Sequence, residues 1–385
     1  MKTPLYISGM GSYLPEVMSA ERAVELGLYS SDDYEWYGWS GATVAGDLSA
    51  PDMAIIAARE AIERSGREPH DIDLHMHSGS WKQGPVGWSA HQYVLRNITD
   101  RDIPSYNVWQ ACNGTMSGME LAASYLMAVP ERTEALLTGA DNLGTPDFNR
   151  WSFGLQNGVL GDGATAVLLS KHEGFARLMA IKTVSTSDLE HLYRGEEPLV
   201  PTTIDNRTKV DFRERMAAVG EGAAVEWMVT RQGDLRAETA LATLAEAGIG
   251  PEDVTRVTHV FTARDAYLKV ILDPIGVDPD KGLGDFGHGW GHLTVNDQIM
   301  GLEHLVETGQ VGPGDHVLMV GHGGGTTITI IVVRIEYNPA WSSRASTPTP
   351  GAKPAEPAPG TGTFQRIRLS PDKIARQRIT TGGAG

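Results

Sequence analysis

Cysteine is nearly absent from this sequence: Cys112 is the only one among 385 residues. One cysteine excludes an intrachain disulfide and any cysteine-rich metal site, and such low usage is typical of proteins from a reducing compartment. The sequence also contains no apolar run of membrane-spanning length and no signal-peptide core at its start. We therefore expect a soluble, cytoplasmic protein that does not associate with a membrane.

Basic residues are few as well, with 32 Lys and Arg against 48 Asp and Glu, which gives a net charge of −16. This balance argues against nucleic acid and anionic membranes as partners, because an acidic surface repels both. An acidic carrier protein would need a local basic patch on which to dock.

The chain alternates between apolar, strand-like stretches and amphipathic helices. The clearest helix spans residues 50–65, where Ile55, Ala58 and Ile62 share one face and Gly66 ends the helix. Such alternation indicates an α/β protein whose buried strands run mostly parallel. The order strand, helix, strand, strand occurs twice, although no sequence repeat is obvious.

The predicted organisation has three parts. Residues 1–172 form a first half that contains the cysteine, and residues 173–337 form a second half with a polar insertion at about residues 186–218. Residues 338–385 form a linker rich in Pro and Ala, followed by a basic segment. This tail is either a disordered, solubilising segment or a contact for the acidic body or a partner.

Cys112 lies where a predicted strand, residues 103–111, turns into a predicted helix, residues 116–127. Gly114 and Gly118 permit a tight turn and a close backbone approach there. A helix N-terminus carries partial positive charge and free N–H groups, which favour the nucleophilic thiolate. From these residues alone, Cys112 is either a nucleophile or a small buried core residue.

Two glycine-rich segments contain histidines that are candidates to act with the cysteine. Residues 286–297 include His288 and His292, and the tight turn 321–325 includes His322. Glycines let backbone N–H groups approach a ligand as an oxyanion hole requires, and a Cys with a His is the minimum for nucleophilic acyl transfer. Any one of these histidines could equally be structural. His288 and His292 lie four residues apart without a third ligand, so we predict neither a metal nor a redox cofactor.

Five short motifs, in their order and spacing, resemble β-ketoacyl-acyl-carrier-protein synthase III, a family of the thiolase superfamily. The motifs are residues 7–15, 111–114, 160–164, 291–294 and 321–326. The resemblance implies a thiolase-like α/β fold in which two similar halves form a five-layer αβαβα sandwich, assembled as a homodimer. It also implies that no cofactor is needed and that the substrate is an acyl carrier protein or coenzyme A thioester.

The resemblance assigns roles to particular residues. Cys112 matches the acyl-carrying cysteine of the family, and the backbone amides of Cys112 and Gly324 would form the oxyanion hole. The family binds its acidic carrier partly through the helix that follows its catalytic histidine, where this chain has Arg264 and Lys269. The alternative is that these two residues are only solvated helix charges. The aromatic stretch 34–39 and the insertion are expected to shape the substrate pocket.

Several positions depart from the family pattern. Phe261, or Thr262 after a one-residue shift, stands where condensing members carry a catalytic histidine. His292 replaces the usual asparagine, His322 takes a position that is usually apolar or aromatic, and the segment at Trp39 lacks the arginine that holds coenzyme A. Decarboxylation of a malonyl thioester needs hydrogen-bond donors on its carbonyl, which phenylalanine cannot supply. His292 instead offers a general base close to the cysteine.

We therefore expect an acyltransferase similar to the branch of this family found in polyketide and other antibiotic pathways. An acyl group would pass to Cys112, and His292 would activate a hydroxyl, an amine or a second carrier as acceptor, with His322 orienting His292 or donating to the carbonyl. A second hypothesis is a decarboxylative condensing enzyme with an atypical Cys-His-His site. A third is an inactive subunit that pairs with an active partner, and the intact cysteine and glycine turn argue against it.

Overall fold

The computed structural model describes residues 3–153, 158–199, 210–220 and 223–343. The predicted basic segment and most of the predicted linker lie outside these ranges. Within them, no helix is both long enough and apolar enough to cross a bilayer.

Nine strands form one sheet in the order β5-β4-β6-β7-β1-β8-β11-β10-β9. The strands of this sheet are β1 (Tyr6–Tyr13), β4 (Leu74–Ser78), β5 (Ser105–Val108), β6 (Glu134–Asp141), β7 (Gly163–Ser170), β8 (Ala176–Ser185), β9 (Val254–Thr258), β10 (His316–Gly323) and β11 (Thr327–Ile335). Two short strands, β2 (Val17–Ser19) and β3 (Gly41–Thr43), pair separately. The helices are α1 (Ala20–Glu25), α2 (Ser31–Tyr37), α3 (Ala50–Ser65), α4 (Ala90–Arg96), α5 (Gly114–Ala128), α6 (His191–Arg194), α7 (Phe212–Val219), α8 (Ala223–Ala247), α9 (Asp265–Leu272) and α10 (Asp297–Glu307).

The strands pair in the same series of directions on both sides of the contact between β1 and β8. On one side β1 pairs antiparallel with β7, β7 antiparallel with β6, and β6 parallel with β4. On the other side β8 pairs antiparallel with β11, β11 antiparallel with β10, and β10 parallel with β9. We call these sides the N-half and the C-half.

The expectation of a mostly parallel sheet is wrong, because antiparallel pairs outnumber parallel ones among the described strands. The physical reason is that β6 and β7 are buried along their whole length. A strand buried on both faces lacks the alternation of buried and exposed residues that is typical of antiparallel strands with one solvated face, so its sequence does not indicate its direction.

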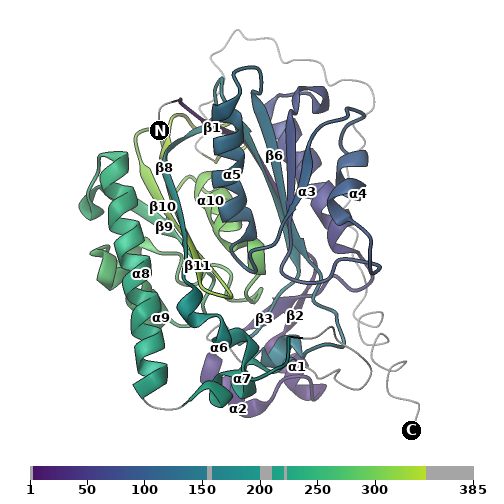
Figure 1. Cartoon of the computed structure of the whole chain (residues 1–385), viewed down its shortest axis with the longest axis vertical. Coiled ribbons are helices and arrows are strands. Elements are labelled where there is room, and N and C mark those ends of the chain that lie inside the picture. Colours follow the sequence, from purple (N-terminus) through teal and green to yellow (C-terminus); the bar gives the residue numbers. More distant parts are fainter. Residues whose placement is uncertain (1–2, 154–157, 200–209, 221–222, 344–385) are drawn as a thin grey trace.

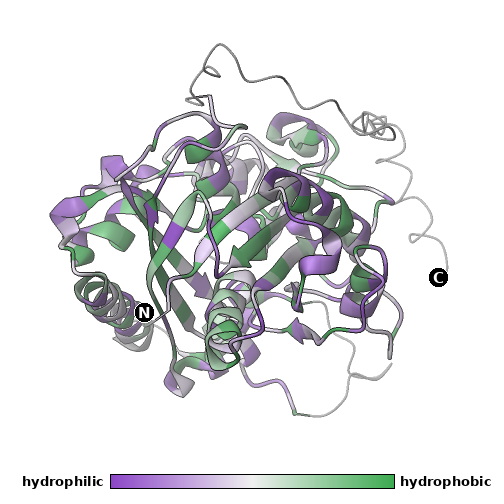
Figure 2. Ribbon diagram, turned by 90° about the horizontal axis from the view of Figure 1, so that it is seen from above, coloured by the Kyte–Doolittle hydropathy of each residue, from purple (hydrophilic) through white to green (hydrophobic). Residues whose placement is uncertain are grey.

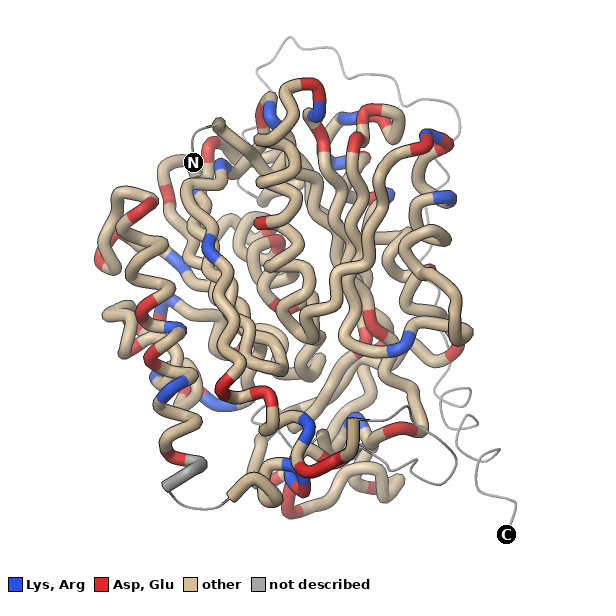
Figure 3. Tube along the Cα trace, in the orientation of Figure 1, with Lys and Arg blue, Asp and Glu red and all other residues tan. Residues whose placement is uncertain are grey.

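Helices and sheet form five layers, as Figure 1 shows from left to right: α8 and α9, the C-half strands, α5 and α10, the N-half strands, and α3 with α4. The central helix α5 contacts β4 and β6 of the N-half and β8 and β11 of the C-half, and α10 likewise contacts strands of both halves. The expected α/β sandwich is thus confirmed. Figure 2 shows hydrophobic residues concentrated along the strands, and Figure 3 shows most charged residues on the outer helices and loops.

Helix α3 illustrates how the sequence specifies a layer. The Ser49 hydroxyl accepts a hydrogen bond from the Asp52 N–H at its start, and Gly66 closes it with φ +66°. The helix backbone lies directly on β1, since a Cβ at Gly9 would fall 2.1 Å from the Ala61 carbonyl oxygen. The helix predicted at residues 50–65 is confirmed in both bounds.

Other predicted elements are displaced or were missed. The helices α2 and α4 were not predicted, because each has only seven residues and too few apolar positions to show a helical period. The apolar run at residues 257–262 is typical of a strand, but β9 ends at Thr258. Residues 259–264 instead form an irregular connection to α9.

Candidate active site

Cys112 lies between β5 and the first turn of α5, as predicted. Ala111, directly before it, has φ +46°, a conformation that costs a non-glycine residue about 1–2 kcal/mol. Asn113 is the N-cap residue of α5, and no acidic residue occupies the first turn of that helix. The partial positive charge of the helix start is therefore available to a thiolate at Cys112.

His292 lies in the loop that leads into α10, and its backbone is bonded to a loop of the N-half. Its N–H donates to the Val159 carbonyl at 2.9 Å, and its carbonyl accepts from the Gly161 N–H at 3.0 Å. The approach is tight, since a Cβ at Gly161 would fall 1.9 Å from the Trp290 carbonyl oxygen. The two motifs at residues 160–164 and 291–294 thus meet in the fold.

Asp297, the first residue of α10, holds the His292 ring. His292 Nδ1 donates to Asp297 Oδ2 at 2.6 Å, and the same carboxylate accepts from the backbone N–H groups of Leu293 and Phe261, each at 2.7 Å. Burial opposes protonation of His292, but the charge of Asp297 and a hydrogen bond with Cys112 outweigh it and raise the pKa of His292 well above its usual value. The arrangement favours the protonated form of His292.

Asp297 has no role predicted from the sequence. The sequence feature that could have identified Asp297 is an acidic residue at the first position of a helix, five residues after a candidate histidine. An acid there is also common simply as a favourable partner of the helix dipole, so the pattern alone did not distinguish the two.

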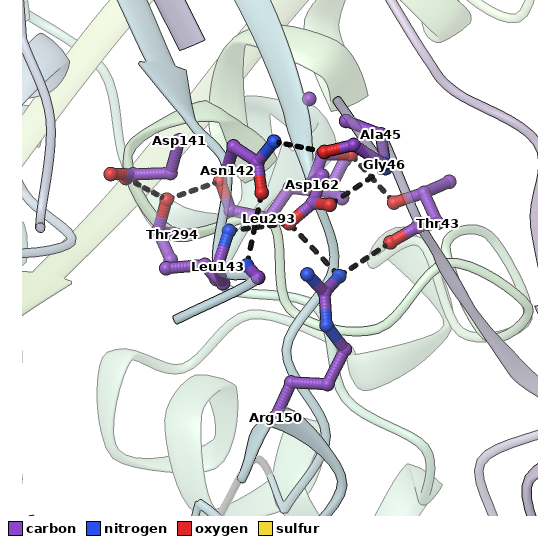
Figure 4. Close-up of polar contacts among 12 residues, drawn as sticks. Thr43, Ala45, Gly46, Asp141, Asn142, Leu143, Arg150, Asp162, Leu293 and Thr294 are labelled. Atoms are coloured by element: carbon purple, nitrogen blue, oxygen red, sulfur yellow. Dashed lines mark hydrogen bonds and ion pairs between the residues drawn. The ribbon is translucent and has the colours of Figure 1, made fainter. Parts of the chain in front are cut away.

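A buried polar network fixes the loops that carry His292 (Figure 4). Asp162 accepts from the backbone N–H groups of Ala45 and Leu143, each at 2.7 Å, and pairs with Arg150 at 2.9 Å. Arg150 also donates to the Thr43 carbonyl at 2.9 Å. Arg150 and Asp162 lie on either side of the loop 159–161, whose backbone is bonded to His292. Their bonds to β3 and Ala45 leave that loop little freedom to shift.

Thr294, two residues after His292, is held by a second carboxylate (Figure 4). Its hydroxyl donates to Asp141 Oδ2 at 2.5 Å, and Thr294 itself has φ +56°. Burial raises the pKa of Asp141 to about 6, against the lowering effect of hydrogen bonds from Thr294 and Ser80. The backbone strain at Thr294 is thus compensated by a strong hydrogen bond.

The glycine turn between β10 and β11 lies against the loop of Cys112. A Cβ at Gly323 would fall 2.4 Å from the Gln110 carbonyl oxygen, and one at Gly324 would fall 3.1 Å from the Tyr193 ring. His322 lies within β10, paired with Ile328 of β11, so the turn predicted at residues 321–325 is confined to residues 324–326. Burial, together with the charges of Arg236 and His292, lowers the pKa of His322 to about 4. His322 is therefore neutral near pH 7, and its Nε2 has no hydrogen-bond partner among the described residues.

A cavity of about 690 Å³ brings Cys112, His292, His322 and Gly324 together. Both segments expected to shape the pocket contribute to its wall, the aromatic stretch through Trp36 and Tyr37 and the insertion through five residues. Those five are Leu192, Tyr193, Phe212, Arg215 and Met216.

Aromatic rings form a continuous part of this wall. Successive ring centroids are 4.9 Å apart for Trp81 and Phe148, 5.4 Å for Phe148 and Phe153, and 4.8 Å for Phe153 and Phe212. Tyr193 continues the series at 6.0 Å from Phe212. One side of the cavity therefore suits an apolar or aromatic group.

Other candidate residues lie elsewhere. His288 packs against Trp39 and does not line the cavity. Phe261 is fully buried, and the adjacent Thr262 lines the cavity in its place. Arg264 and Lys269 are exposed on α9 and its N-cap, outside the cavity, and the Arg264 side chain donates to the Glu35 carbonyl at 2.8 Å. Among the described residues no cluster of three His, Cys, Asp or Glu side chains could hold a metal ion.

Comparison with known proteins identifies the family. Residues 106–187 match the family model of 3-oxoacyl-[acyl-carrier-protein] synthase III, and residues 244–335 match the model of its C-terminal part. The solved structure of ChlB3, described as an acyltransferase, is 38% identical over 88% of this chain and 100% of its own, with a TM-score of 0.82. The chain belongs to the β-ketoacyl-acyl-carrier-protein synthase III-like family of the thiolase superfamily.

More distant members agree with this assignment. β-Ketoacyl-[acyl-carrier-protein] synthase III of Listeria welshimeri is 25% identical over 85% of this chain and 98% of its own length. The structure of the Aquifex aeolicus synthase III, at 20% identity and a TM-score of 0.71, covers 86% of this chain and 99% of its own and shows the same fold. The family is thus supported over nearly the whole described chain.

Proposed function

We propose that this protein is an acyltransferase that moves an acyl group from an acyl carrier protein or coenzyme A thioester, through Cys112, to a hydroxyl, an amine or a second carrier. The observation that carries the proposal is that His292, whose Nδ1 is held by Asp297 at 2.6 Å, lines the same cavity as Cys112, which is the arrangement of a nucleophile, a base and an orienting acid. The similarity to ChlB3, itself described as an acyltransferase, supports it.

In the first step the Cys112 thiolate attacks the thioester carbonyl. The backbone N–H groups of Cys112 and Gly324 stabilise the oxyanion, and the start of α5 adds its partial positive charge. The carbon–sulfur bond to the carrier breaks, and the leaving thiolate takes the proton of the His292 imidazolium. The products are the acyl-enzyme, a free carrier thiol and a neutral His292.

In the second step the acceptor attacks the acyl-enzyme. Neutral His292 takes the proton of the attacking hydroxyl, amine or thiol, and the bond between the acyl carbon and Cys112 breaks to regenerate the thiolate. Asp297 stabilises the imidazolium that forms and fixes the tautomer that presents Nε2 to the acceptor.

A condensing enzyme is the second candidate, and one observation favours it. His322 is neutral, lines the same cavity and has an unpartnered Nε2, so His292 and His322 together could donate to a malonyl thioester carbonyl. Such an enzyme would release carbon dioxide from a malonyl carrier. The oxygen of Thr262, which replaces the family's catalytic histidine on the cavity wall, is a poorer substitute for an imidazole donor. An inactive partner subunit is the remaining alternative.

The proposal includes a carrier-docking surface at Arg264 and Lys269, a homodimeric assembly and a cytoplasmic location in a pathway of secondary metabolism. The docking surface is supported by the exposure of both side chains on the helix beside the cavity mouth residues Tyr267 and Val270.

The test is the intact-protein mass after incubation with a panel of acyl thioesters, for wild type and Cys112→Ala. We expect a mass gain equal to the acyl group in wild type only, followed by its loss when an acceptor is added. A gain of equal size in Cys112→Ala would overturn the covalent scheme. Carbon dioxide release from malonyl carrier by the acylated enzyme would establish the condensing reaction instead.

A further inference from the structure

The cavity wall contains two arginines in different electrostatic situations. Arg215 is paired: its Nε lies 2.7 Å from Glu197 Oε1, and it also donates to the Tyr193 carbonyl at 2.9 Å. Arg236 of α8 has no carboxylate partner among the described residues, and its one hydrogen bond runs to the Val270 carbonyl at 3.1 Å. No Asp or Glu of the described residues lines the cavity. Arg236 therefore has no carboxylate among the described residues to balance its charge in the cavity.

Arg236 is partly buried, and it has no carboxylate partner among the described residues. Burial lowers the pKa of its guanidinium, which reflects the cost of keeping a cation away from water. A buried charge without a partner is among the most expensive features that a fold can retain. An arginine presents five donors and binds carboxylates in a bidentate fashion, so four of its donors remain available here.

His322 supplies a second, independent indication. Its side chain lines the cavity, and its Nε2 is shielded from solvent with no hydrogen-bond partner among the described residues. It is close enough to both Arg236 and His292 to feel the charge of each. Arg236, His322 and the reacting pair thus line the same cavity.

We propose that Arg236 and His322 form an anion site that binds a carboxylate of the substrate held beside Cys112. The proposal rests on the proposed function only in taking Cys112 as the reactive group, and it adds the chemical class of the second substrate. The site lies on the α8 and α9 wall, opposite in character to the aromatic wall. The cavity thus suits an apolar or aromatic acyl group on one side and an acidic acceptor on the other.

The phosphate of a carrier arm is the other anion to consider. Its distance from the thioester is that of a whole pantetheine chain, whereas Arg236 and His322 line the same cavity as Cys112. This difference favours a carboxylate on the substrate itself.

The test uses two alkylating reagents of the same size, iodoacetate and iodoacetamide, which differ in the carboxylate. The rate of Cys112 alkylation by each is followed by intact-protein mass in wild type, Arg236→Gln and Arg231→Gln. Arg231 is the matched control, because it is an arginine of the same helix that does not line the cavity. We expect the iodoacetate-to-iodoacetamide rate ratio to fall at least tenfold in Arg236→Gln and less than twofold in Arg231→Gln.

A ratio within twofold of wild type in Arg236→Gln, or an equal fall in both variants, would overturn the anion site. If Arg236→Gln does not fold, wild type alone decides: benzoate must slow alkylation by iodoacetamide at least fivefold more than benzamide does. Protection by pantetheine 4′-phosphate but not by pantetheine, lost in Arg236→Gln, would assign the site to phosphate and overturn the carboxylate. If neither reagent modifies Cys112, the result counts against the proposed function itself. The failure of the anion site and the failure of the proposed function are therefore distinguishable.

Discussion

The two central helices, α5 and α10, begin with the same kind of hydrogen bond, between an asparagine of one half and a threonine of the other, but the residues beside that asparagine differ. We call each of these bonds a lock. Asn113 precedes α5 and donates to the Thr329 hydroxyl of β11 at 2.8 Å, whereas Asn296 precedes α10 and accepts from the Thr165 hydroxyl of β7 at 2.8 Å. In each case an asparagine of one half is bonded to a threonine of the other half. Beside each asparagine lies a glycine of a neighbouring strand, at which a Cβ would clash.

The difference lies in the residues on either side of each asparagine. Before Asn113 stands Cys112, and after it Gly114; after Asn296 stands Asp297, in the first turn of α10. The start of α5 is thus left open to a developing anion, whereas the start of α10 is already neutralised by a carboxylate that holds His292. A duplicated framework can therefore place a nucleophile at one helix start and its supporting acid at the other.

The largest effect is expected from Asp297→Asn, which removes the carboxylate at the start of α10. An amide cannot stabilise the His292 imidazolium, so we expect acyl transfer to fall by roughly a thousandfold while the fold persists. Because the folded-state pKa of His292 is raised, its stabilising contribution is complete below about pH 6.5 and is lost as pH rises through the raised pKa. The gap in unfolding free energy between wild type and variant should therefore be widest on the acidic side. A variant that keeps more than a tenth of wild-type transfer would contradict the role of Asp297.

A paired test of the two locks is Thr329→Val against Thr165→Val. Asn113 has no other side-chain donor bond, whereas the Asn296 amide also donates to the carbonyls of Gly163 and Leu293. We expect Thr329→Val to lower the unfolding free energy by about 2 kcal/mol and acyl transfer by roughly tenfold, and Thr165→Val to cost about 1 kcal/mol. Chemical denaturation and transfer assays measure both. Equal effects on transfer would mean that the two helix starts are functionally equivalent.

The substitution His322→Gln tests, through the pH dependence of the unfolding free energy, whether His322 is neutral in the folded protein. In the folded protein His322 has a pKa of about 4, below the value of about 6.5 in an unfolded chain. Between these values the unfolded chain binds the extra proton, so stability rises with pH through this window and is lost on acidification. We expect wild type to lose about 2 kcal/mol more than His322→Gln between pH 6.5 and pH 4.5. Parallel pH profiles of unfolding free energy would show that His322 is not neutral in the fold.

The smallest expected effect concerns the outer helices. Lys269→Glu on α9 should raise the KM for a carrier-bound donor severalfold and leave transfer from a small thioester nearly unchanged. Arg96→Glu on α4 of the N-half is the matched exposed control and should change neither. An equal rise for both donors in Lys269→Glu would exclude a docking role, and an equal rise in both variants would indicate only the change in net charge.

Much of this arrangement could be predicted from local patterns. Helix α3 was predictable because its cap, its apolar face and its closing glycine all occur within 18 residues. The turn at Cys112 was predictable for the same reason, whereas the turn predicted at residues 321–325 is observed only at residues 324–326, because β10 continues through Gly323. The role of Asp297 depends on one hydrogen bond, and the exposure of Arg236 to the cavity depends on which side of α8 faces it. Those facts arise from packing between segments distant in sequence, which a residue pattern does not encode.

The locks at the starts of α5 and α10 also constrain the order of events during synthesis. The ribosome releases Cys112 long before β11 and His292, so a nascent N-half has neither the threonine that holds Asn113 nor the base that supports the thiolate. If Cys112 is the acyl-carrying residue, as we propose, the only thiol of the chain gains its supporting base only as the last strands join the sheet. The topology would then keep a half-made chain from being acylated.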